Sequence, residues 1–189
     1  MKKSIWKVIL CVSMLFVLFL STVSATSVEG QKAELRQKTV TTLDQLYQKQ
    51  PKARYAIEHA AGYAVFNNTG FQLGLLGTAH GRGLAANNIT GQEVFMNMKQ
   101  YQAGLGLGIK EYAVIFVFSN QDAWNTFVNK GWSFGGQATA VADDGVNGDS
   151  MEGAFQVAPG TWLYQMATKG LSAELTVGGT NYYKDKDLN

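Results

Sequence analysis

The chain has 189 residues, of which 46% are hydrophobic, and its 16 lysines and arginines nearly balance its 14 aspartates and glutamates. Such a small charge imbalance gives no indication of a nucleic-acid partner. The single cysteine, Cys11, lies in an apolar leader segment. The rest of the sequence contains no cysteine, which excludes a disulfide, a cysteine nucleophile and a cysteine-ligated metal there. The roughly 160 residues after the leader are enough to bury the core of one domain.

The first 25 residues have the pattern of a secretory signal peptide. Early lysines form a basic start, an apolar run extends over residues 8–20, and Val23-Ser24-Ala25 is a small-residue cleavage site. A retained membrane anchor is disfavoured because no basic cluster follows the apolar run, and lipidation of Cys11 is disfavoured because no small residue precedes it. We therefore predict an exported protein, periplasmic or membrane-peripheral, that is cleaved near Ala25 and forms a single domain over residues 26–189.

Two helices are predicted before residue 62. Residues 31–50 place one continuous arc of mainly apolar side chains on a helical wheel. That arc contains Leu35, Thr39, Val40, Leu43, Leu46 and Tyr47. A second short helix is expected over residues 52–61, because Pro51 suits a first turn and Gly62 suits a helix end. Its predicted inward residues are Ala53, Ile57 and Ala60.

From residue 63 onward the hydrophobic period falls to two, which indicates β-strands. Strands are predicted over residues 63–66, 71–76, 78–86, 93–98, 101–109, 112–118, 134–142, 153–157, 161–168 and 171–178. One helix is expected at residues 122–129, and turns are expected at Asn67–Gly70 and Asn87–Asn88. The predicted fold class is therefore α+β, with N-terminal helices packed on a glycine-rich, strongly bent antiparallel sheet or half-closed barrel that carries one inserted helix.

The predicted strand at residues 101–109 alternates two kinds of side chain. One face has Gln102, Gly104, Gly106 and Gly108, and the other has Tyr101, Ala103, Leu105, Leu107 and Ile109. A strand with a bare glycine face lets another backbone or a helix approach closely, so we expect a tightly packed neighbour there. On this basis Gly106→Val is expected to destabilise the fold by overpacking.

Two glycine motifs match catalytic or nucleotide-binding signatures in the wrong context. The segment Gly131-Trp-Ser133-Phe-Gly135 has the G-x-S-x-G pattern of a nucleophile elbow, but the predicted helix precedes the serine and no histidine follows it. We interpret it as a helix-to-strand turn in which Trp132 and Phe134 fill the core. Gly81-Arg-Gly83 is similar to a dinucleotide fingerprint, but Asn87-Asn88 prevent the helix that such a motif must open.

Candidate metal ligands are sparse. Residues 143–149, together with Glu152, offer the oxygen ligands that calcium prefers, but their spacing departs from an EF-hand loop and suits ordinary turns. His59, at a predicted helix end, and His80, in a predicted strand, lack carboxylate partners at metal-binding spacing. We therefore expect no enzyme activity, no catalytic residue, no cofactor and no metal.

Basic residues gather in the two predicted N-terminal helices. Six of the 13 that lie outside the leader fall within 23 positions: Lys32, Arg36, Lys38, Lys49, Lys52 and Arg54. One interpretation is a solvated helix face. The other is an amphipathic, locally basic segment that contacts anionic lipid headgroups, which makes these six residues the candidate lipid-binding site.

Several motifs between residue 52 and the end form an ordered set. They are Ala61-Gly-Tyr-Ala-Val-Phe66, Gly70-Phe71, Gly81-Arg-Gly83, Gly104-Leu-Gly-Leu-Gly108, Gly131-Trp-Ser-Phe-Gly-Gly-Gln137, Gly170-Leu171 and residues 181–189. Together they resemble the SYLF-domain lipid-binding family, in its exported bacterial branch. The resemblance implies a phospholipid-binding module without a catalytic centre. Eukaryotic relatives bind phosphoinositides, but here Asn68-Thr69 replaces a lysine of their pattern, so that preference is not carried over.

Two functional hypotheses follow. The first is a non-enzymatic, membrane-peripheral module of the bacterial envelope that binds phospholipid, with an anionic membrane surface as its partner. The alternative is a structural or protein-interaction domain of the periplasm that binds an envelope protein through exposed aromatic residues or a sheet edge. Because lysine and arginine contacts to headgroups weaken as salt rises, salt dependence discriminates between the two hypotheses.

Overall fold

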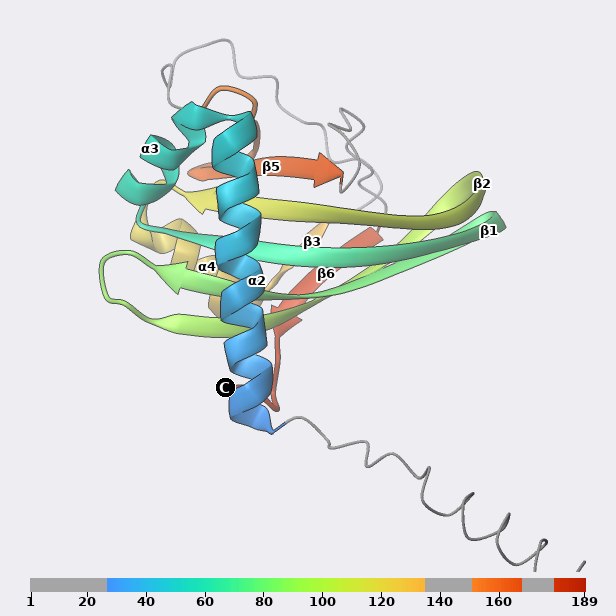
Figure 1. The fold of residues 1–189 in the computed structure, drawn as a ribbon, viewed down its shortest axis with the longest axis horizontal. Helices are drawn as coiled ribbons and strands as arrows, with labels where there is room; N and C mark the ends of the chain where they lie inside the picture. Colours follow the sequence, from blue (N-terminus) through green and yellow to red (C-terminus); the bar gives the residue numbers. More distant parts are fainter. Residues whose placement is uncertain (1–26, 135–150, 168–178) are drawn as a thin grey trace, which may run out of the picture.

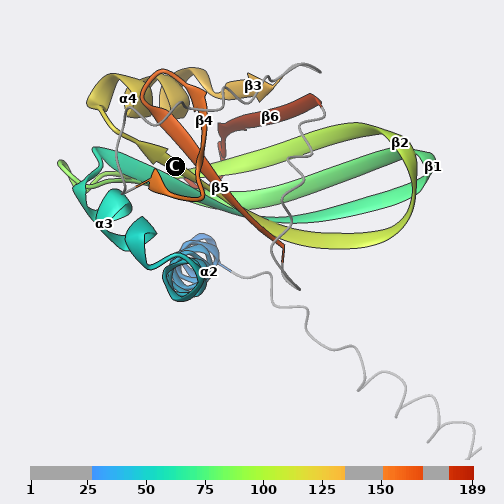
Figure 2. The same ribbon diagram turned by 90° about the horizontal axis from the view of Figure 1, so that it is seen from above.

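The computed structural model describes residues 27–134, 151–167 and 179–189. This part of the chain forms three helices and six strands (Figures 1 and 2). They are α2 (Val28–Lys49), α3 (Pro51–His59), β1 (Gly62–Asn87), β2 (Glu93–Phe118), α4 (Gln121–Lys130), β3 (Trp132–Phe134), β4 (Phe155–Ala158), β5 (Thr161–Ala167) and β6 (Gly179–Lys184).

The helices begin where their first backbone N–H groups are satisfied or absent. Ser27 Oγ accepts a hydrogen bond from Gly30 N (3.1 Å) at the start of α2, and Asn120 Oδ1 accepts one from Ala123 N (2.9 Å) at the start of α4. Pro51 occupies the first turn of α3, where a missing N–H leaves no bond unmade. The three predicted helices are confirmed, and α2 begins earlier than expected because Ser27 caps it.

Strands β1 and β2 form one long antiparallel ribbon that bends back on itself. The register runs from Gly62 opposite Phe118 to Ala86 opposite Glu93, with one shift directly after Gly74. Gly74 has φ +66°, a conformation that favours glycine, and the ribbon turns there. The two halves of β1 therefore lie side by side (Figures 1 and 2), and a Cβ built on Gly62 would lie 2.7 Å from Ala86 O.

The bend turns the six labelled strands into an eight-segment antiparallel sheet that curls into a half-barrel. The two halves of β1 lie in the middle, flanked by the two halves of β2. Residues 96–101 of β2 pair with β6, which pairs with β3. Residues 112–118 of β2 pair with β5, which pairs with β4. The predicted α+β fold with a strongly bent antiparallel sheet is therefore confirmed.

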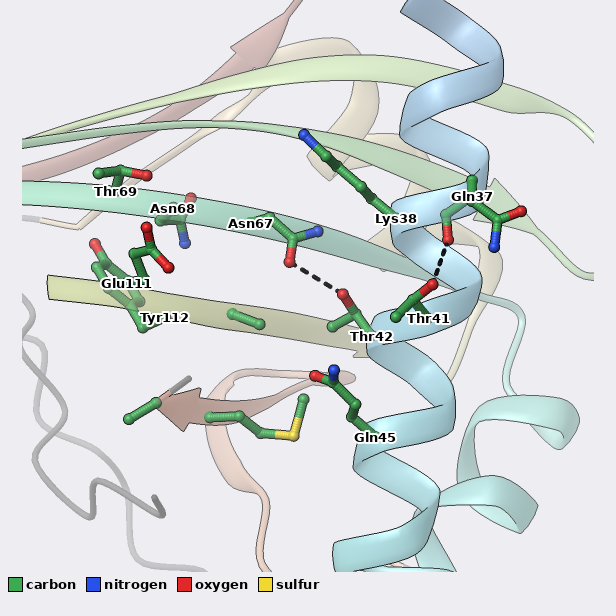
Figure 3. Close-up of a pocket in the computed structure, with 13 residues that line it drawn as sticks. Gln37, Lys38, Thr41, Thr42, Gln45, Asn67, Asn68, Thr69, Glu111 and Tyr112 are labelled. Atoms are coloured by element: carbon green, nitrogen blue, oxygen red, sulfur yellow. Dashed lines mark hydrogen bonds between the residues drawn. The ribbon is translucent and has the colours of Figure 1, made fainter. Parts of the chain in front are cut away.

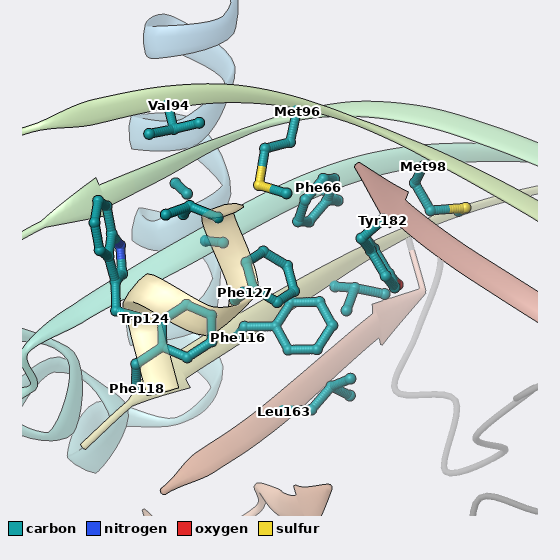
Figure 4. Packing of buried hydrophobic residues seen from close by; sticks show 14 of the residues in the cluster. Phe66, Val94, Met96, Met98, Phe116, Phe118, Trp124, Phe127, Leu163 and Tyr182 are labelled. Atoms are coloured by element: carbon teal, nitrogen blue, oxygen red, sulfur yellow. The ribbon is translucent and has the colours of Figure 1, made fainter. Parts of the chain in front are cut away.

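One face of the curled sheet, called here the inner face, carries an aromatic core beneath α4 (Figure 4). Phe66, Phe116 and Phe118 contact Phe127 of α4, and Phe66 and Phe116 also contact Tyr182 of β6, with ring centroids 4.7–6.2 Å apart. All five side chains are at most 4% exposed. Edge-to-face and tilted aromatic pairs of this kind add to the stabilisation that comes from burial.

The opposite face, called here the outer face, is covered by α2 and α3 over only part of its area. Leu46 and Ile57 of these helices pack on Val65 and Ile115 of the sheet, and all four are at most 2% exposed. Figure 1 shows α2 crossing the sheet while the bent end of the β1–β2 ribbon extends beyond it. The helical cover therefore ends before the strands do.

The predicted inward arc of α2 is confirmed with one exception. Its buried residues are Leu35, Thr39, Thr42, Leu43 and Leu46. Val40 was expected in the arc but is 54% exposed. Thr42 is buried instead, because its hydroxyl donates a hydrogen bond to Asn67 Oδ1 (3.0 Å) on β1 and so satisfies two polar groups at the interface.

The chain after β6 packs on the outer face near the start of α2. Leu188 is 2% exposed and forms a small apolar cluster with Leu35, Leu84 and Phe95. The side-chain amide of Asn189 accepts a hydrogen bond from Phe95 N (3.0 Å) and donates one to Phe95 O (2.8 Å). This segment therefore connects the first half of β2 to α2.

Two local expectations from the sequence are wrong. The segment Asn67–Gly70 is not a turn: it continues β1 and pairs with residues 110–113 of β2. The expected close neighbour on the glycine face is missing at Gly108, where an added Cβ has nothing within 4 Å. The close approach occurs instead at Gly81 and Gly83, which lie against the first half of β1.

Several other expectations fall partly or wholly outside the described residues. The predicted strand at 134–142 lies outside them beyond Phe134, and the one at 171–178 lies wholly outside. The surroundings of Gly106 are likewise not described, so Gly106→Val stays a prediction. The strand β6 was not predicted, and the predicted strand at 153–157 is displaced to β4.

Candidate functional site

Near the bend of the ribbon, the surface beyond α2 carries a group of exposed apolar side chains. The group, called here the apolar patch, consists of Phe71, Leu73, Leu75, Leu76, Tyr101 and Ile109, which are 52–73% exposed. Cross-strand pairing brings members of both strands together, for example Phe71 opposite Ile109. Single exposed apolar residues are ordinary, but a group gathered at one place indicates a contact surface.

The alternation of the strand explains why this group is exposed. Val65 and Phe71 belong to the same outward row of β1, because they are an even number of residues apart. Val65 is fully buried beneath the helices, whereas Phe71 is 52% exposed. At about 3.3 Å per residue the two lie roughly 20 Å apart along the strand, and the helical cover ends within that distance.

Basic side chains flank the apolar patch. Lys99 lies two residues before Tyr101 and therefore on the same face of β2, whereas Lys110 directly follows Ile109 and alternates to the opposite face. Both lysines are exposed, and Lys99 Nζ lies 5.7 Å from the ring centroid of Tyr183. An apolar centre with long cationic side chains at its rim suits the boundary between hydrocarbon and headgroups.

A polar pocket of about 400 Å³ lies between α2 and the outer face (Figure 3). Its polar lining comprises Gln37, Lys38, Thr41, Thr42 and Gln45 from α2 and Asn67, Thr69 and Glu111 from the sheet. The Thr42–Asn67 hydrogen bond joins the helix to the strand there. The volume is within the range of pockets that take small ligands.

The polar pocket and the apolar patch are neighbours on one face. Thr69 lies two residues before Phe71 on β1, and Glu111 lies two residues after Ile109 on β2. A two-residue step along a strand spans about 7 Å and returns to the same face. A ligand with its polar end in the pocket would therefore place an attached apolar part along the patch.

Asn68 and Tyr112 border the pocket, but their side chains belong to the inner face. Tyr112 Oη donates a hydrogen bond to Gln100 Oε1 (2.5 Å), and burial raises the pKa of Tyr112 to about 12. Asn68 is 3% exposed, and its amide has no hydrogen-bond partner within the described part of the chain. A Cβ built on Gly81 would overlap this amide, which shows how closely the two halves of β1 approach.

The six predicted lipid-binding residues lie along α2 and α3. Five of them have a carboxylate partner: Lys32–Glu29 (3.2 Å), Arg36–Glu93 (2.7 Å), Lys38–Glu34 (2.7 Å), Lys52–Glu152 (2.9 Å) and Arg54–Glu58 (3.4 Å). Lys49 forms no ion pair with any residue in the described ranges. Exposed ion pairs contribute about 0–1 kcal/mol, so these cations are only weakly held by their partners. Lys38 also lines the polar pocket.

The nucleophile-elbow motif has no catalytic geometry in the described residues. Ser133 Oγ donates a hydrogen bond to Asn181 Oδ1 (2.6 Å). His59 stacks on Tyr55 with ring centroids 3.9 Å apart, and its Nδ1 lies 2.9 Å from Tyr55 O, so it is engaged elsewhere. Trp132 packs against the inner core, as the sequence predicted, whereas the side chain of Phe134 lies outside the described part.

The described ranges hold neither a cluster of metal ligands nor a membrane-spanning helix. Residues 143–149, the candidate calcium loop, fall outside them. Within the described ranges no group of three or more histidine, cysteine, aspartate or glutamate side chains comes together. No helix in the same ranges is both long and apolar enough to cross a bilayer.

Comparison with known proteins agrees with the predicted family. Residues 99–189 match the Ysc84 family model, described as "Las17-binding protein actin regulator". The chain is also 35% identical over 150 residues to Beta cell expansion factor A of Aeromonas veronii, and the alignment covers 78% of this chain and 55% of that protein. The chain therefore spans about half the length of this relative. The SYLF resemblance predicted from the sequence is confirmed.

Proposed function

We propose that this chain, which belongs to the Ysc84 (SYLF) family, is a non-enzymatic module that binds phospholipid membranes through the apolar patch. Family membership supports a lipid- or actin-related binding domain. The observation that carries the proposal is the patch itself: six apolar side chains, each more than half exposed, gathered at one end of the ribbon, with the exposed Lys99 on the same face. A bilayer is the partner that matches an apolar surface with a basic rim.

Hydrophobic burial supplies most of the expected binding energy. Fully burying a leucine, isoleucine or phenylalanine side chain contributes about 1.5–3 kcal/mol. Six side chains that are 52–73% exposed therefore supply on the order of 5–10 kcal/mol, before the ordering costs of binding. Lys99, on the same face as the patch, adds about 1 kcal/mol near an anionic surface. We therefore expect binding to neutral vesicles that strengthens modestly with anionic lipid and depends only weakly on salt.

The six basic residues of α2 and α3 are proposed as a second, electrostatic contact. Replacing Lys49, Lys52 and Arg54 together by glutamine removes at most about 3 kcal/mol of attraction to an anionic surface. The carboxylate partners of Lys52 and Arg54 reduce that attraction further. We expect this triple variant to bind anionic vesicles less tightly at low salt and to bind neutral vesicles as the wild type does.

The decisive experiment is liposome co-sedimentation with Leu76→Ser and a matched control. Leu76 is 73% exposed within the apolar patch, and Ile89 is 71% exposed in the turn at the opposite end of the β1–β2 ribbon. Leu76→Ser and Ile89→Ser therefore remove similar apolar surface from two places. We expect Leu76→Ser to weaken vesicle binding roughly tenfold, which corresponds to about 1.4 kcal/mol, and Ile89→Ser to bind like the wild type.

The same measurements discriminate the membrane proposal from its alternative. If Leu76→Ser and Ile89→Ser bind equally well while both are folded, the apolar patch is not the contact. If the wild-type chain does not bind pure lipid vesicles at all, a protein partner becomes the better explanation of the patch. The family description as a Las17-binding actin regulator is the observation that supports such a partner.

Export is a further part of the proposal. It is supported by the basic start, the apolar run and the small residues before Thr26. We expect the mature protein to be periplasmic or membrane-peripheral and to begin at Thr26. N-terminal sequencing of protein from the native envelope tests this, and recovery of a chain that still begins at Met1 would contradict it.

A further inference from the structure

We propose that His80, Lys99 and Asn181 form a binding site for the phosphate group of an anionic phospholipid, on the outer face beside the apolar patch. These three side chains are called here the donor row. The inference rests on the proposed function, because it assigns a headgroup contact and a dependence on pH to the face that contacts the bilayer. The apolar patch accounts for binding to any bilayer, whereas the donor row would respond to the charge of the headgroup, so the two are tested separately.

The strand register places the donor row side by side. His80 of β1 lies opposite Lys99 of β2, and Lys99 lies opposite Asn181 of β6. Side chains that are directly opposite on one face of an antiparallel sheet have Cβ atoms about 4.5–5.5 Å apart. The three side chains can therefore reach one phosphate group.

Strand alternation places the donor row on the face of the apolar patch. His80 lies four residues before Leu84, which is buried on the outer face, and Asn181 directly precedes Tyr182, which is buried on the inner face. Lys99 shares its face with the patch, and all three side chains of the row are exposed. A surface that meets the patch therefore meets the donor row as well.

The donor row offers hydrogen-bond donors that the described part of the chain does not use. Asn181 Oδ1 accepts a hydrogen bond from Ser133 Oγ (2.6 Å), so the NH₂ group of Asn181 is the part left to donate. Lys99 has three donors and no carboxylate partner among the described residues, and its Nζ lies 5.7 Å from the ring centroid of Tyr183. His80 forms no hydrogen bond or ion pair within the described ranges, so both of its ring nitrogens can meet a phosphate oxygen.

The charged groups around His80 leave the positive charge of Lys99 unbalanced. On the outer face these groups come from α2, both strands of the ribbon and the segment after β6, and they are Glu34, Lys38, Arg82, Lys99, Glu111 and Asp185. Four of them form two ion pairs, Lys38–Glu34 (2.7 Å) and Arg82–Asp185 (3.2 Å). Glu111 lies opposite Thr69 on the other half of the ribbon and has an interaction of its own. Protonation of His80 therefore places a second positive charge beside Lys99.

The histidine makes this site sensitive to pH. Histidine is the side chain whose charge changes between roughly pH 5 and pH 8. One further cation near an anionic surface strengthens binding about threefold to fivefold. We therefore expect binding to anionic membranes to tighten as the pH falls through this range, and binding to neutral membranes to stay constant.

The position of the donor row matches the depth of a headgroup. A bilayer with a hydrocarbon core of about 30 Å measures about 40–45 Å with its headgroups, which leaves about 5–8 Å of headgroup layer on each side. Lys99 lies two residues, or about 7 Å, behind Tyr101 of the patch. With Tyr101 at the hydrocarbon boundary, the donor row therefore lies within the headgroup layer.

Vesicle composition, pH and the two histidines of the chain test the site. Co-sedimentation is measured at about pH 5.5 and about pH 7.5 with phosphatidylcholine vesicles and with vesicles that also contain phosphatidylglycerol, whose phosphodiester keeps its charge over this interval. We expect wild-type affinity for phosphatidylglycerol vesicles to be about threefold to fivefold higher at the lower pH. His80→Gln should abolish this rise and keep the affinity for phosphatidylcholine. His59→Gln, at the other histidine, is the matched control and should retain the rise.

Asn181→Ala distinguishes a phosphate site from a general attraction of charge, because it removes a donor and leaves the net charge unchanged. A hydrogen bond to a charged group contributes more than one between neutral groups. We expect Asn181→Ala to bind phosphatidylglycerol vesicles about threefold to tenfold less tightly at both pH values and to bind phosphatidylcholine vesicles as the wild type does. An unchanged affinity of folded Asn181→Ala for phosphatidylglycerol vesicles overturns the inference.

Equal responses to pH in His80→Gln and His59→Gln, or no response in the wild type, overturn the inference and leave the patch proposal to its own test with Leu76→Ser on neutral vesicles. A titration with glycerophosphoglycerol, the headgroup of phosphatidylglycerol without its acyl chains, decides the donor row by NMR even if no vesicle binds. We expect shifts at His80 and Asn181 that glycerol does not produce, and their absence overturns the inference. Saturation by inorganic phosphate at a lower concentration than by glycerophosphoglycerol would instead assign the row to free phosphate and overturn its assignment to a lipid.

Discussion

Gly83→Ala is expected to destabilise the fold strongly, because it places a methyl group between the two halves of β1. A Cβ built on Gly83 would overlap the carbonyl oxygen of Val65 and lie 2.5 Å from Phe66 Cδ1. Cβ atoms in proteins essentially never come within 3.0 Å of a heavy atom of a distant residue, so the strands must shift. Neither neighbour moves easily, because a backbone oxygen cannot rotate away and Phe66 is fully buried in the inner core.

The expected magnitude follows from the cost of overpacking. Inserting a methyl group into a well-packed site costs about 1–3 kcal/mol, and a backbone neighbour places Gly83→Ala at the upper end of that range. A domain of this size loses about 2–4 °C of melting temperature for each kcal/mol. We therefore expect the melting temperature of Gly83→Ala to fall by roughly 5–10 °C.

Thermal unfolding and urea titration of the mature chain measure this effect against Gly179→Ala. Gly179 lies in β6, and a Cβ built there has nothing within 4 Å. The control variant should melt at the wild-type temperature or slightly above it, because alanine reduces the freedom of the unfolded chain. Equal melting temperatures for the two variants would refute the close packing of the two halves of β1.

Two further predictions concern the segment after β6. Leu188→Ala should lower the free energy of unfolding by about 2–4 kcal/mol in a urea titration, because the side chain is 2% exposed; a loss below about 1 kcal/mol would contradict its packing. Burial opposes ionisation of Asp185, but hydrogen bonds from Asp187 N and Arg82 outweigh it and hold the pKa of Asp185 below its ordinary 3.8. A carboxyl group whose pKa is lowered by folding stabilises the fold above its unfolded pKa and loses that contribution as the pH falls through the lowered value. Asp185→Asn should therefore lower the free energy of unfolding by roughly 1–3 kcal/mol near pH 7. Below about pH 4 the free energies of unfolding of the variant and the wild type should become more alike. A difference in free energy of unfolding that stays constant with pH would contradict this prediction.

Hydrophobic periodicity predicted the three helices, because the buried side of each helix can be read from the spacing of its own apolar residues. An amphipathic arc reports directly which side of a helix meets the core, so α2, α3 and α4 were found within a few residues. The length of β1 was not predictable in this way, because Asn67–Gly70 has the composition of a turn. The structure keeps that segment extended through partners distant in sequence: Thr42 binds the Asn67 side chain, and Tyr112 lies opposite Asn68.

The candidate site was only partly visible in the sequence. The alternation of residues 101–109 identified an apolar face that includes Tyr101 and Ile109, but alternation does not say what covers a face. We expected a close neighbour on the glycine face and predicted nothing of the apolar face, on which both side chains are at least 65% exposed. The two N-terminal helices, of 22 and nine residues, cover only part of the outer face of a ribbon with 26-residue strands. The polar pocket could not be predicted from the sequence, because its lining comes from three segments that are distant in sequence, namely residues 37–45, residues 67–69 and residue 111.

The part of the ribbon that stabilises the fold differs from the part that is exposed to a binding partner. The half near Val65 is buried by helices on both faces, and its core holds the fold together. The far half carries the apolar patch, whose exposed side chains contribute little to folding and are left to bind. Gly83→Ala should therefore lower the melting temperature, whereas Leu76→Ser should lower vesicle affinity at an unchanged melting temperature. If Leu76→Ser destabilised the fold as much as Gly83→Ala, the patch would be part of the core rather than a surface for a partner.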